Sequence, residues 1–212
     1  MNSWLTMAIK ENDEKQIESF FQDVKKIQNE KNEAFLILAQ EGRLKHIQKF
    51  LTLGIDFTYE EEGWTALGVA AANGHLKIMQ ELAQAGADIN HQSSRGWTPL
   101  MLACCNHQDQ VVDWLIHQGA KLDLCDLNQK TALMCAAHFG SFKIVCRLIE
   151  EGADLFKKDN KQRDAYTIAM QEGHQEIAQA VKEAVKKKMK EIKTLISSKQ
   201  IGLTQDLSKQ KD

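Results

Sequence analysis

The chain has 212 residues, and its 27 basic and 29 acidic side chains give a net charge of −2 at pH 7. This balance argues against a general attraction to nucleic acid or to an anionic membrane, so we expect no nucleic-acid partner. The charge is unevenly distributed, because residues 182–212 hold nine lysines and four acidic residues, which leaves about −7 on residues 1–181.

The number of cysteines and the length of the apolar segments indicate the cellular compartment in which the chain works. The five cysteines are odd in number and follow the positions of an internal repeat, which is typical of a reducing environment. The N-terminal segment has no basic region followed by a long apolar run, and no segment approaches the length of a membrane span. We therefore expect a cytoplasmic protein, with nuclear location and delivery into a host cell as open alternatives.

The internal repeat is the strongest signal in the sequence. Its copies open at Thr65, Thr98, Thr131 and Asp164, which stand 33 residues apart. A fixed period of this length predicts a stack of similar supersecondary units, in which each unit covers the apolar face of its neighbour.

The N-terminal residues 1–31 fit a two-helix unit in which Asn12 and Val24 replace the glycines of the other copies. We expect them to form a cap with a polar outer face. Repeats are then predicted at about 32–62, 63–95, 96–128 and 129–161. The apolar positions of the cap are Leu5, Ala8, Ile17, Phe20 and Phe21.

One repeat, residues 63–95, shows how each unit is built. Thr65 is a good N-cap, because its hydroxyl accepts from the free amides of the first helical turn. A short helix then runs to Asn73–Gly74, and a second helix runs to Gly86, since glycine tolerates the left-handed backbone at a helix end. The small residues Ala70 and Ala71 let neighbouring helices approach closely.

A C-terminal cap is predicted at residues 162–185, and a basic extension follows at 186–212. Val185 stands where a terminating glycine is found in other units, so the last helix runs on. Apolar residues recur in it at intervals of three and four among lysines, which predicts a basic amphipathic helix. From Ser197 the sequence is polar and weakly periodic, so we expect a flexible tail.

Together these residues resemble the ankyrin repeat family. The middle copies carry its pattern as Gly63-Trp64-Thr65-Ala66-Leu67, Gly74-His75 and Gly86-Ala87-Asp88, and again as Gly96-Trp97-Thr98-Pro99-Leu100. The resemblance covers about residues 1–185. It implies an all-α solenoid of stacked antiparallel helix pairs with short hairpin-like fingers. The histidine of the family motif is replaced by Gly68, Met101, Met134 and Thr167.

The resemblance also implies where a partner binds. Members of the family act by binding proteins on a concave face, which is built from the finger tips and the exposed side of each first helix. We expect Trp64 and Trp97 to stand side by side as an apolar anchor, since aromatic and arginine side chains dominate interface energetics; the alternative is that each indole packs over its own finger. The predicted partner-binding residues are Trp64, Asn73, Arg95, Trp97, Asn106, Lys130, His138, Phe139 and Arg163.

Charge along this face also predicts how a partner docks. Glu60, Glu61 and Glu62 make one end acidic, and Arg95, Lys130, Lys161 and Arg163 make the other end basic. A partner with the opposite gradient would dock in one orientation.

Catalysis and metal binding are not expected. Cys104, Cys105 and His107 lie close together, but Cys104 occupies the small core position of Ala71 and His107 replaces a turn glycine. Nothing in the sequence supplies an oriented base or paired metal-ligand spacing. We therefore predict no catalytic residues, no metal and no cofactor; an enzyme using Cys105 with His107 or His138 is the rival hypothesis.

The favoured function is a monomeric interaction module or adaptor that binds another protein. One alternative is a membrane- or lipid-associated adaptor that uses the basic C-terminal helix, and another is a microbial effector that binds host proteins. For that helix we favour a solvated extension whose apolar stripe folds back on the last repeat, because the stripe is narrow and lacks aromatic anchors. A partner helix and a nuclear signal are its other interpretations.

Overall fold

The computed structural model of the chain describes residues 13, 15, 17, 19 and 28–209. Most of the predicted N-terminal cap therefore lies outside the described residues, including Leu5, Ala8, Phe20 and Phe21. Ile17 is described and is buried. The boundaries of the predicted repeats stay a prediction, and the first described helix begins at Gln28, before the repeat expected at about residue 32.

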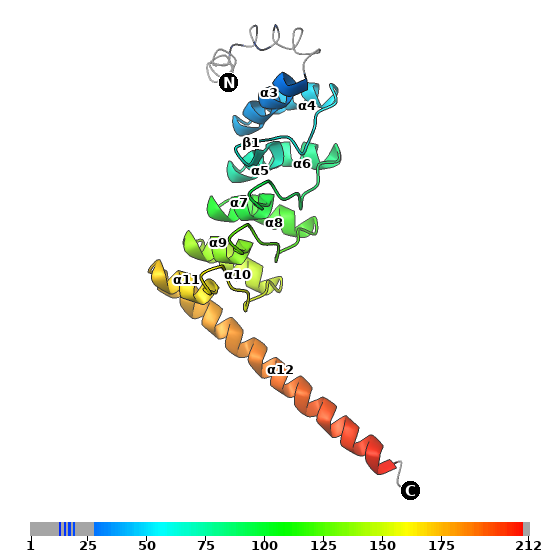
Figure 1. The fold of residues 1–212 in the computed structure, drawn as a ribbon, viewed down its shortest axis with the longest axis vertical. Coiled ribbons are helices and arrows are strands. Elements are labelled where there is room, and N and C mark those ends of the chain that lie inside the picture. Colours follow the sequence, from blue (N-terminus) through cyan, green and yellow to red (C-terminus); the bar gives the residue numbers. More distant parts are fainter. Residues whose placement is uncertain (1–12, 14, 16, 18, 20–27, 210–212) are drawn as a thin grey trace.

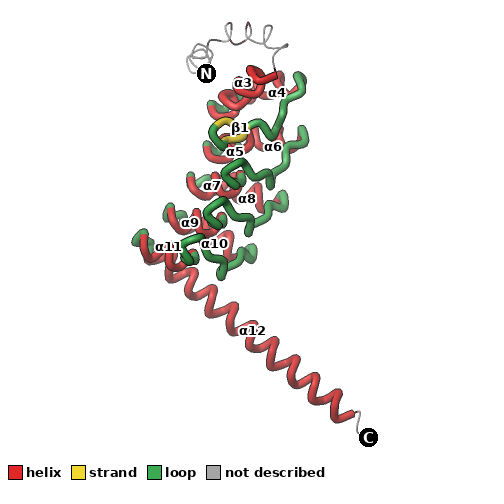
Figure 2. The backbone as a smooth tube through the Cα atoms, viewed as in Figure 1, coloured by secondary structure: helices red, strands yellow, loops and turns green. Residues whose placement is uncertain are grey.

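The described residues form a stack of helix pairs in two columns (Figure 1). Extended loops join one pair to the next (Figure 2). Within the described residues, β1 (Glu60–Glu61) and β2 (Trp64–Thr65) pair antiparallel and form a single two-stranded ribbon. The first helices of the pairs are α3 (Gln28–Gln40), α5 (Ala66–Ala72), α7 (Pro99–Cys105), α9 (Ala132–His138) and α11 (Ala165–Gln171). The second helices are α4 (Leu44–Leu51), α6 (Leu76–Gln84), α8 (Asp109–His117), α10 (Phe142–Glu150) and α12 (Gln175–Lys209).

The predicted N-caps of the first helices are confirmed. The Thr65 hydroxyl accepts a hydrogen bond from the Gly68 amide at 3.1 Å. The other copies repeat this bond, and the Asp164 carboxylate takes the same role for the Thr167 amide at 2.8 Å. Each cap satisfies one of the amides that a helix start leaves unpaired.

The turn between the two helices of a unit also ties that unit to the one before it. His75 Nε2 lies 2.9 Å from the Gln40 carbonyl oxygen, and His174 Nε2 lies 3.1 Å from that of His138. Ser141 occupies the equivalent position in its own unit, and its Oγ donates a hydrogen bond of 3.3 Å to the Cys104 carbonyl oxygen. The two histidines therefore have a structural role at these turns.

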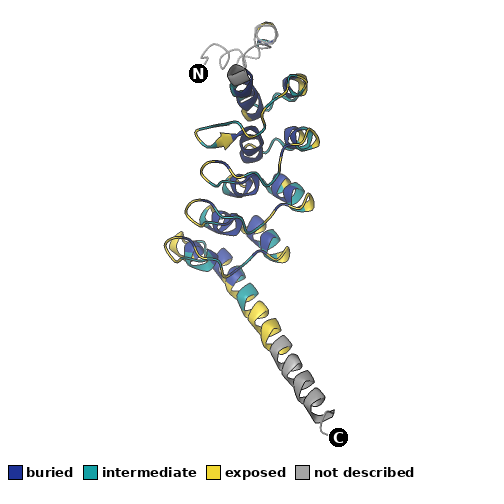
Figure 3. Cartoon of the chain, turned by 45° about the vertical axis from the view of Figure 1, so that its right-hand side comes forward, coloured by how far each residue is buried: buried dark blue, intermediate teal, exposed yellow. Residues whose placement is uncertain are grey.

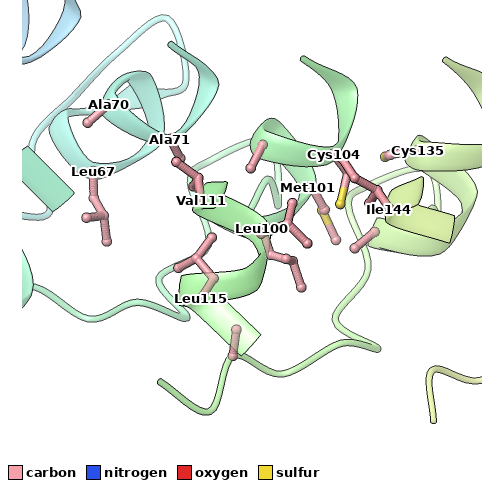
Figure 4. Packing of buried hydrophobic residues seen from close by; sticks show 14 of the residues in the cluster. Leu67, Ala70, Ala71, Leu100, Met101, Cys104, Val111, Leu115, Cys135 and Ile144 are labelled. Carbon is pink, nitrogen blue, oxygen red and sulfur yellow. The ribbon is translucent and has the colours of Figure 1, made fainter. Parts of the chain in front are cut away.

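Small residues let the first helices pack closely along the stack. Ala70 and Ala71 of α5 and Cys104 of α7 are fully buried, and they lie between helices in the close-up of the core (Figure 4). Leu67 and Leu100 fill the space beneath them. The core is thus a continuous strip through the stack, which no single unit could form alone.

The last helix runs beyond the stack (Figure 3). Its first turns pack on α10 and α11 through Ile177 and Val181, which are buried. The predicted stripe does not fold back as a whole, because Met189 and Ile192 are exposed. The helix continues beyond Ser197 to Lys209, and the flexibility expected from Ser197 stays a prediction. Among the described helices, none combines the length and apolar character needed to span a bilayer.

Candidate protein-binding face

The fingers are the loops that lead into each first helix, and they are joined to one another in series. The Ser94 amide donates to the Glu60 carboxylate at 2.8 Å, which links the first finger to the second. The Leu127 amide donates to the Arg95 carbonyl at 3.2 Å in the next step. These bonds hold the finger tips in fixed register, so the concave face, defined by finger tips and first helices, is preformed.

Trp64 is the half-exposed aromatic residue of the first finger and borders a hollow of about 320 Å³ on this face. Its side chain is 37% exposed. The Trp64–Glu61 pairing in the β1–β2 ribbon fixes the backbone from which the indole projects. A volume of this size holds one or two side chains of a partner. The other lining residues are Leu36, Gln40, Glu61, Glu62, Val69, Ala72, Asn73 and Asn106.

Three predicted site residues therefore meet at one hollow: Trp64, Asn73 and Asn106. The Asn73 side-chain amide donates to the Val69 carbonyl at 2.8 Å, and that of Asn106 donates to the Leu102 carbonyl at 2.9 Å. Each bond leaves the side-chain oxygen available to accept from a ligand. These two residues end α5 and α7, so equivalent positions in neighbouring repeats bring them to the same side.

Trp97 occupies the same register as Trp64 but differs in exposure. It is half-buried and packs against the hydrophobic core. Of the two indoles that we expected to stand exposed side by side, Trp64 is exposed and Trp97 is not. The repeat pattern fixed the position of Trp97 but could not reveal how far its neighbours cover it.

A second exposed group lies at the end of α9. Phe139 is 47% exposed and contacts the ring of His138 edge-on at a centroid distance of 4.8 Å. His138 Nδ1 lies 3.0 Å from a Glu172 carboxylate oxygen, which ties it to the end of α11. This group belongs to the concave face by register.

The predicted basic residues differ in whether their charge is available. The Arg163 guanidinium donates to Asp159 through Nε at 2.9 Å and through Nη2 at 2.7 Å, and Nη1 bonds to Gln171. Arg95 is exposed, and its methylenes lie against the backbone of Gly63. Lys130 is partly buried, and its backbone amide donates to Asp126. The charge of Arg163 is thus matched within its own finger.

Asp159 shows what this pairing does to the finger. Burial alone would raise its pKa, but hydrogen bonds from the Arg163 side chain and from the amides of Arg163 and Lys161 outweigh burial and lower the pKa. The carboxylate is therefore a structural anion at neutral pH.

Sequence reasoning missed two residues of this face. Leu36 and Val69, together with Ala72, form the apolar floor beneath Trp64, and Leu36 and Val69 were not considered. Leu127 is 69% exposed at a finger tip. The repeat register already indicated this finger position, where the equivalent residues are the polar Glu61, Ser94 and Asn160.

The cysteine and histidine cluster has structural contacts. Burial, and then the neighbouring Cys105, raise the pKa of the Cys104 thiol, which disfavours the thiolate that a nucleophile requires. A hydrogen bond with Cys105, together with burial, raises the pKa of Cys135. His107 Nδ1 lies 2.6 Å from Ser141 Oγ, and its backbone takes the left-handed conformation predicted for a glycine replacement. Across the part of the chain that the structure describes, no three His, Cys, Asp or Glu side chains are grouped to hold a metal.

A hollow larger than that beside Trp64 lies between α8 and α10, with a volume of about 640 Å³. Ion pairs cross it from helix to helix, Lys143–Asp109 at 2.9 Å and Arg147–Asp113 at 3.1 Å. Four charged side chains of this hollow are therefore paired within the fold, whereas the side chains of Glu61 and Glu62 make no hydrogen bond or ion pair within the described residues. We take the Trp64 hollow as the candidate site for this reason.

Comparison with known proteins agrees with this architecture. No curated protein matches the chain. The family model described as ankyrin repeats (3 copies) matches residues 5–93, 35–126 and 100–193. Ankyrin repeats are generally protein–protein interaction modules, and the family is typically non-enzymatic. With these matches and a stack of helix pairs joined by fingers, the chain belongs to the ankyrin repeat family.

Proposed function

We propose that this chain is an adaptor that binds a partner protein through its concave face and has no catalytic activity of its own. The observation that carries the proposal is the half-exposed Trp64 beside a hollow with an apolar floor and polar rim. An aromatic side chain in such a setting is the usual energetic centre of a protein interface.

The rigidity of the face supports the same function. Hydrogen bonds between consecutive fingers and the inter-repeat contacts of His75 and His174 hold the surface in one conformation. A preformed surface loses little conformational entropy on association, which favours binding. We place the adaptor in the cytoplasm and expect a monomer, consistent with the five free thiols of the chain.

The distribution of charge suggests how the partner is oriented. Glu61 and Glu62, which have no ion-pair partner in the part of the chain that the structure describes, lie at the first finger, and Lys130 and Lys161 lie on the third and fourth fingers. Arg163 contributes less than the sequence suggested, because Asp159 neutralises it. A partner that carries the opposite order of charges meets the face in one direction.

Affinity capture from a matched lysate tests the proposal with two aromatic variants on different faces. Trp64→Ala removes the anchor, and Phe142→Ala removes a side chain of similar exposure (45%) beside the hollow between α8 and α10. We expect proteins captured by the parent chain to be lost with Trp64→Ala and retained with Phe142→Ala. Capture that depends on Phe142 and not on Trp64 would move the interface to the opposite side.

A further inference from the structure

The Trp64 hollow carries an acidic rim over an apolar floor, and this combination indicates the chemistry of its occupant. Leu36, Val69 and Ala72 are almost completely buried and present only their edges to the hollow. The indole of Trp64 forms its wall. An apolar side chain of a partner would therefore leave water and contact carbon on several sides.

The charged side chains that line this hollow, Glu61 and Glu62, are both acidic. Glu60, the third acid of the run, is already used within the fold, because its two carboxylate oxygens accept from the Ser94 amide at 2.8 and 3.1 Å. Within the described residues the other two carboxylates make no hydrogen bond or ion pair, so they are available to an external cation.

This acidic pair is specific to the first finger. The equivalent positions are Ser94 and Arg95 in the second finger, Leu127 and Asn128 in the third, and Asn160 and Lys161 in the fourth. The repeat pattern therefore does not require two acids here. Two like charges side by side also repel each other, and a bound cation relieves that repulsion.

We propose that the Trp64 hollow recognises a protein segment in which an apolar side chain stands next to a lysine or arginine. The apolar side chain enters between Trp64 and the floor, and the cation meets the carboxylates of Glu61 and Glu62. This inference rests on the proposed function, since it names the chemistry of the partner at the same face.

Selection from a library of random peptides tests the inference. Peptides of about 12 residues, which span roughly 40 Å when extended, are selected for binding to the full chain. The selected sequences should place a Leu, Ile, Met or aromatic residue within two positions of Lys or Arg. Binding of the corresponding synthetic peptides should weaken about tenfold or more with Trp64→Ala.

The acidic rim is tested with a charge-matched pair of double variants. Glu61→Gln with Glu62→Gln should weaken peptide binding about three- to tenfold, and added salt should shrink that difference. Glu150→Gln with Glu176→Gln removes two exposed carboxylates remote from the hollow and should leave binding unchanged. A peptide whose basic residue is replaced by Glu should regain binding to Glu61→Lys with Glu62→Lys.

The outcomes separate the two proposals. Peptides that depend on Trp64 but carry no basic residue would overturn the inference and leave the proposed function standing. Selected peptides that bind Trp64→Ala as well as the parent chain would overturn both. A peptide of residues 182–194, which places Met189 among lysines, serves as the probe for a second copy of the chain. If it binds best and the full chain self-associates in sedimentation, the occupant is this chain and the inference of a separate partner fails.

Discussion

The first two complete fingers carry the same Gly-Trp-Thr sequence but present it differently. Thr65 and Thr98 cap their helices with bonds of 3.1 and 3.2 Å, so the two helix starts are alike. Trp64 stands half-exposed beside a hollow, whereas Trp97 packs against the core. The difference teaches that register fixes where a finger residue lies, and that neighbouring fingers decide whether its side chain is available for binding.

The two finger glycines should show the largest difference in stability. Both have a positive φ, but a Cβ at Gly96 would lie 2.9 Å from the Asp126 Cα, while the three atoms nearest to one at Gly63 all belong to the flexible Arg95 side chain. Gly96→Ala should cost about 3 kcal/mol, and Gly63→Ala about 1 to 2 kcal/mol. Urea unfolding followed by circular dichroism measures both. Equal losses would mean that the second finger is not packed more tightly than the first.

Truncation of the two indoles should also give unequal losses. Trp97→Ala removes packing against the core and should lower the free energy of unfolding by about 2 kcal/mol, less than a fully buried tryptophan would. Trp64→Ala should cost about 1 kcal/mol or less, because its indole contacts fewer neighbours. Thermal unfolding of the two variants checks the order. A reversed order would identify Trp64 as a core residue and remove it as the anchor.

The helix caps, by contrast, should behave alike in the two fingers. Thr65→Ala and Thr98→Ala each remove one hydrogen bond to the third residue of a short helix. Each should cost about 1 kcal/mol. Urea midpoints of the two variants are the relevant measurement, and a clear inequality would show that the two helix starts are not equivalent.

The smallest effect is expected from acid titration at the fourth finger, where the position of Glu60 is taken by Asp159. The pKa of Asp159 is lowered in the folded protein. Its contribution to stability is therefore present above the ordinary value of 3.8 and is lost as the pH falls through the lowered folded value. Asp159→Asn should reduce the loss of stability that occurs as the pH falls, and urea midpoints measured from neutral to acidic pH check this. An unchanged acid dependence would assign that loss to other carboxylates.

Much of the fold could be predicted from the sequence, because the repeat imposes the same local chemistry on every copy. Thr131 and Asp164 were identified as caps, and Gly74 and His107 as left-handed turn positions, from spacing alone. These features depend only on residues that are close in sequence, which a periodic pattern records directly.

The site was less predictable, because it depends on contacts between repeats. The burial of Trp97 arises from the packing of neighbouring side chains. The pairing of Arg163 with Asp159 forms within one finger, and the other repeats do not hold this pair of residues, so the periodic pattern did not indicate it. The floor residues Leu36 and Val69 follow a core pattern, so their edges on the surface leave no trace in the sequence. The end of α12 was also missed, since weak periodicity beyond Ser197 did not stop the helix before Lys209.

Hydrogen exchange on the chain bound to a captured partner or a selected peptide tests the central claim most directly. We predict that binding slows amide exchange in residues 60–73 and at the end of α7 near Asn106, which surround the Trp64 hollow. Exchange in α8 and α10 should remain unchanged. Protection confined to α8 and α10 would contradict the assignment and place the binding surface on the opposite side of the stack.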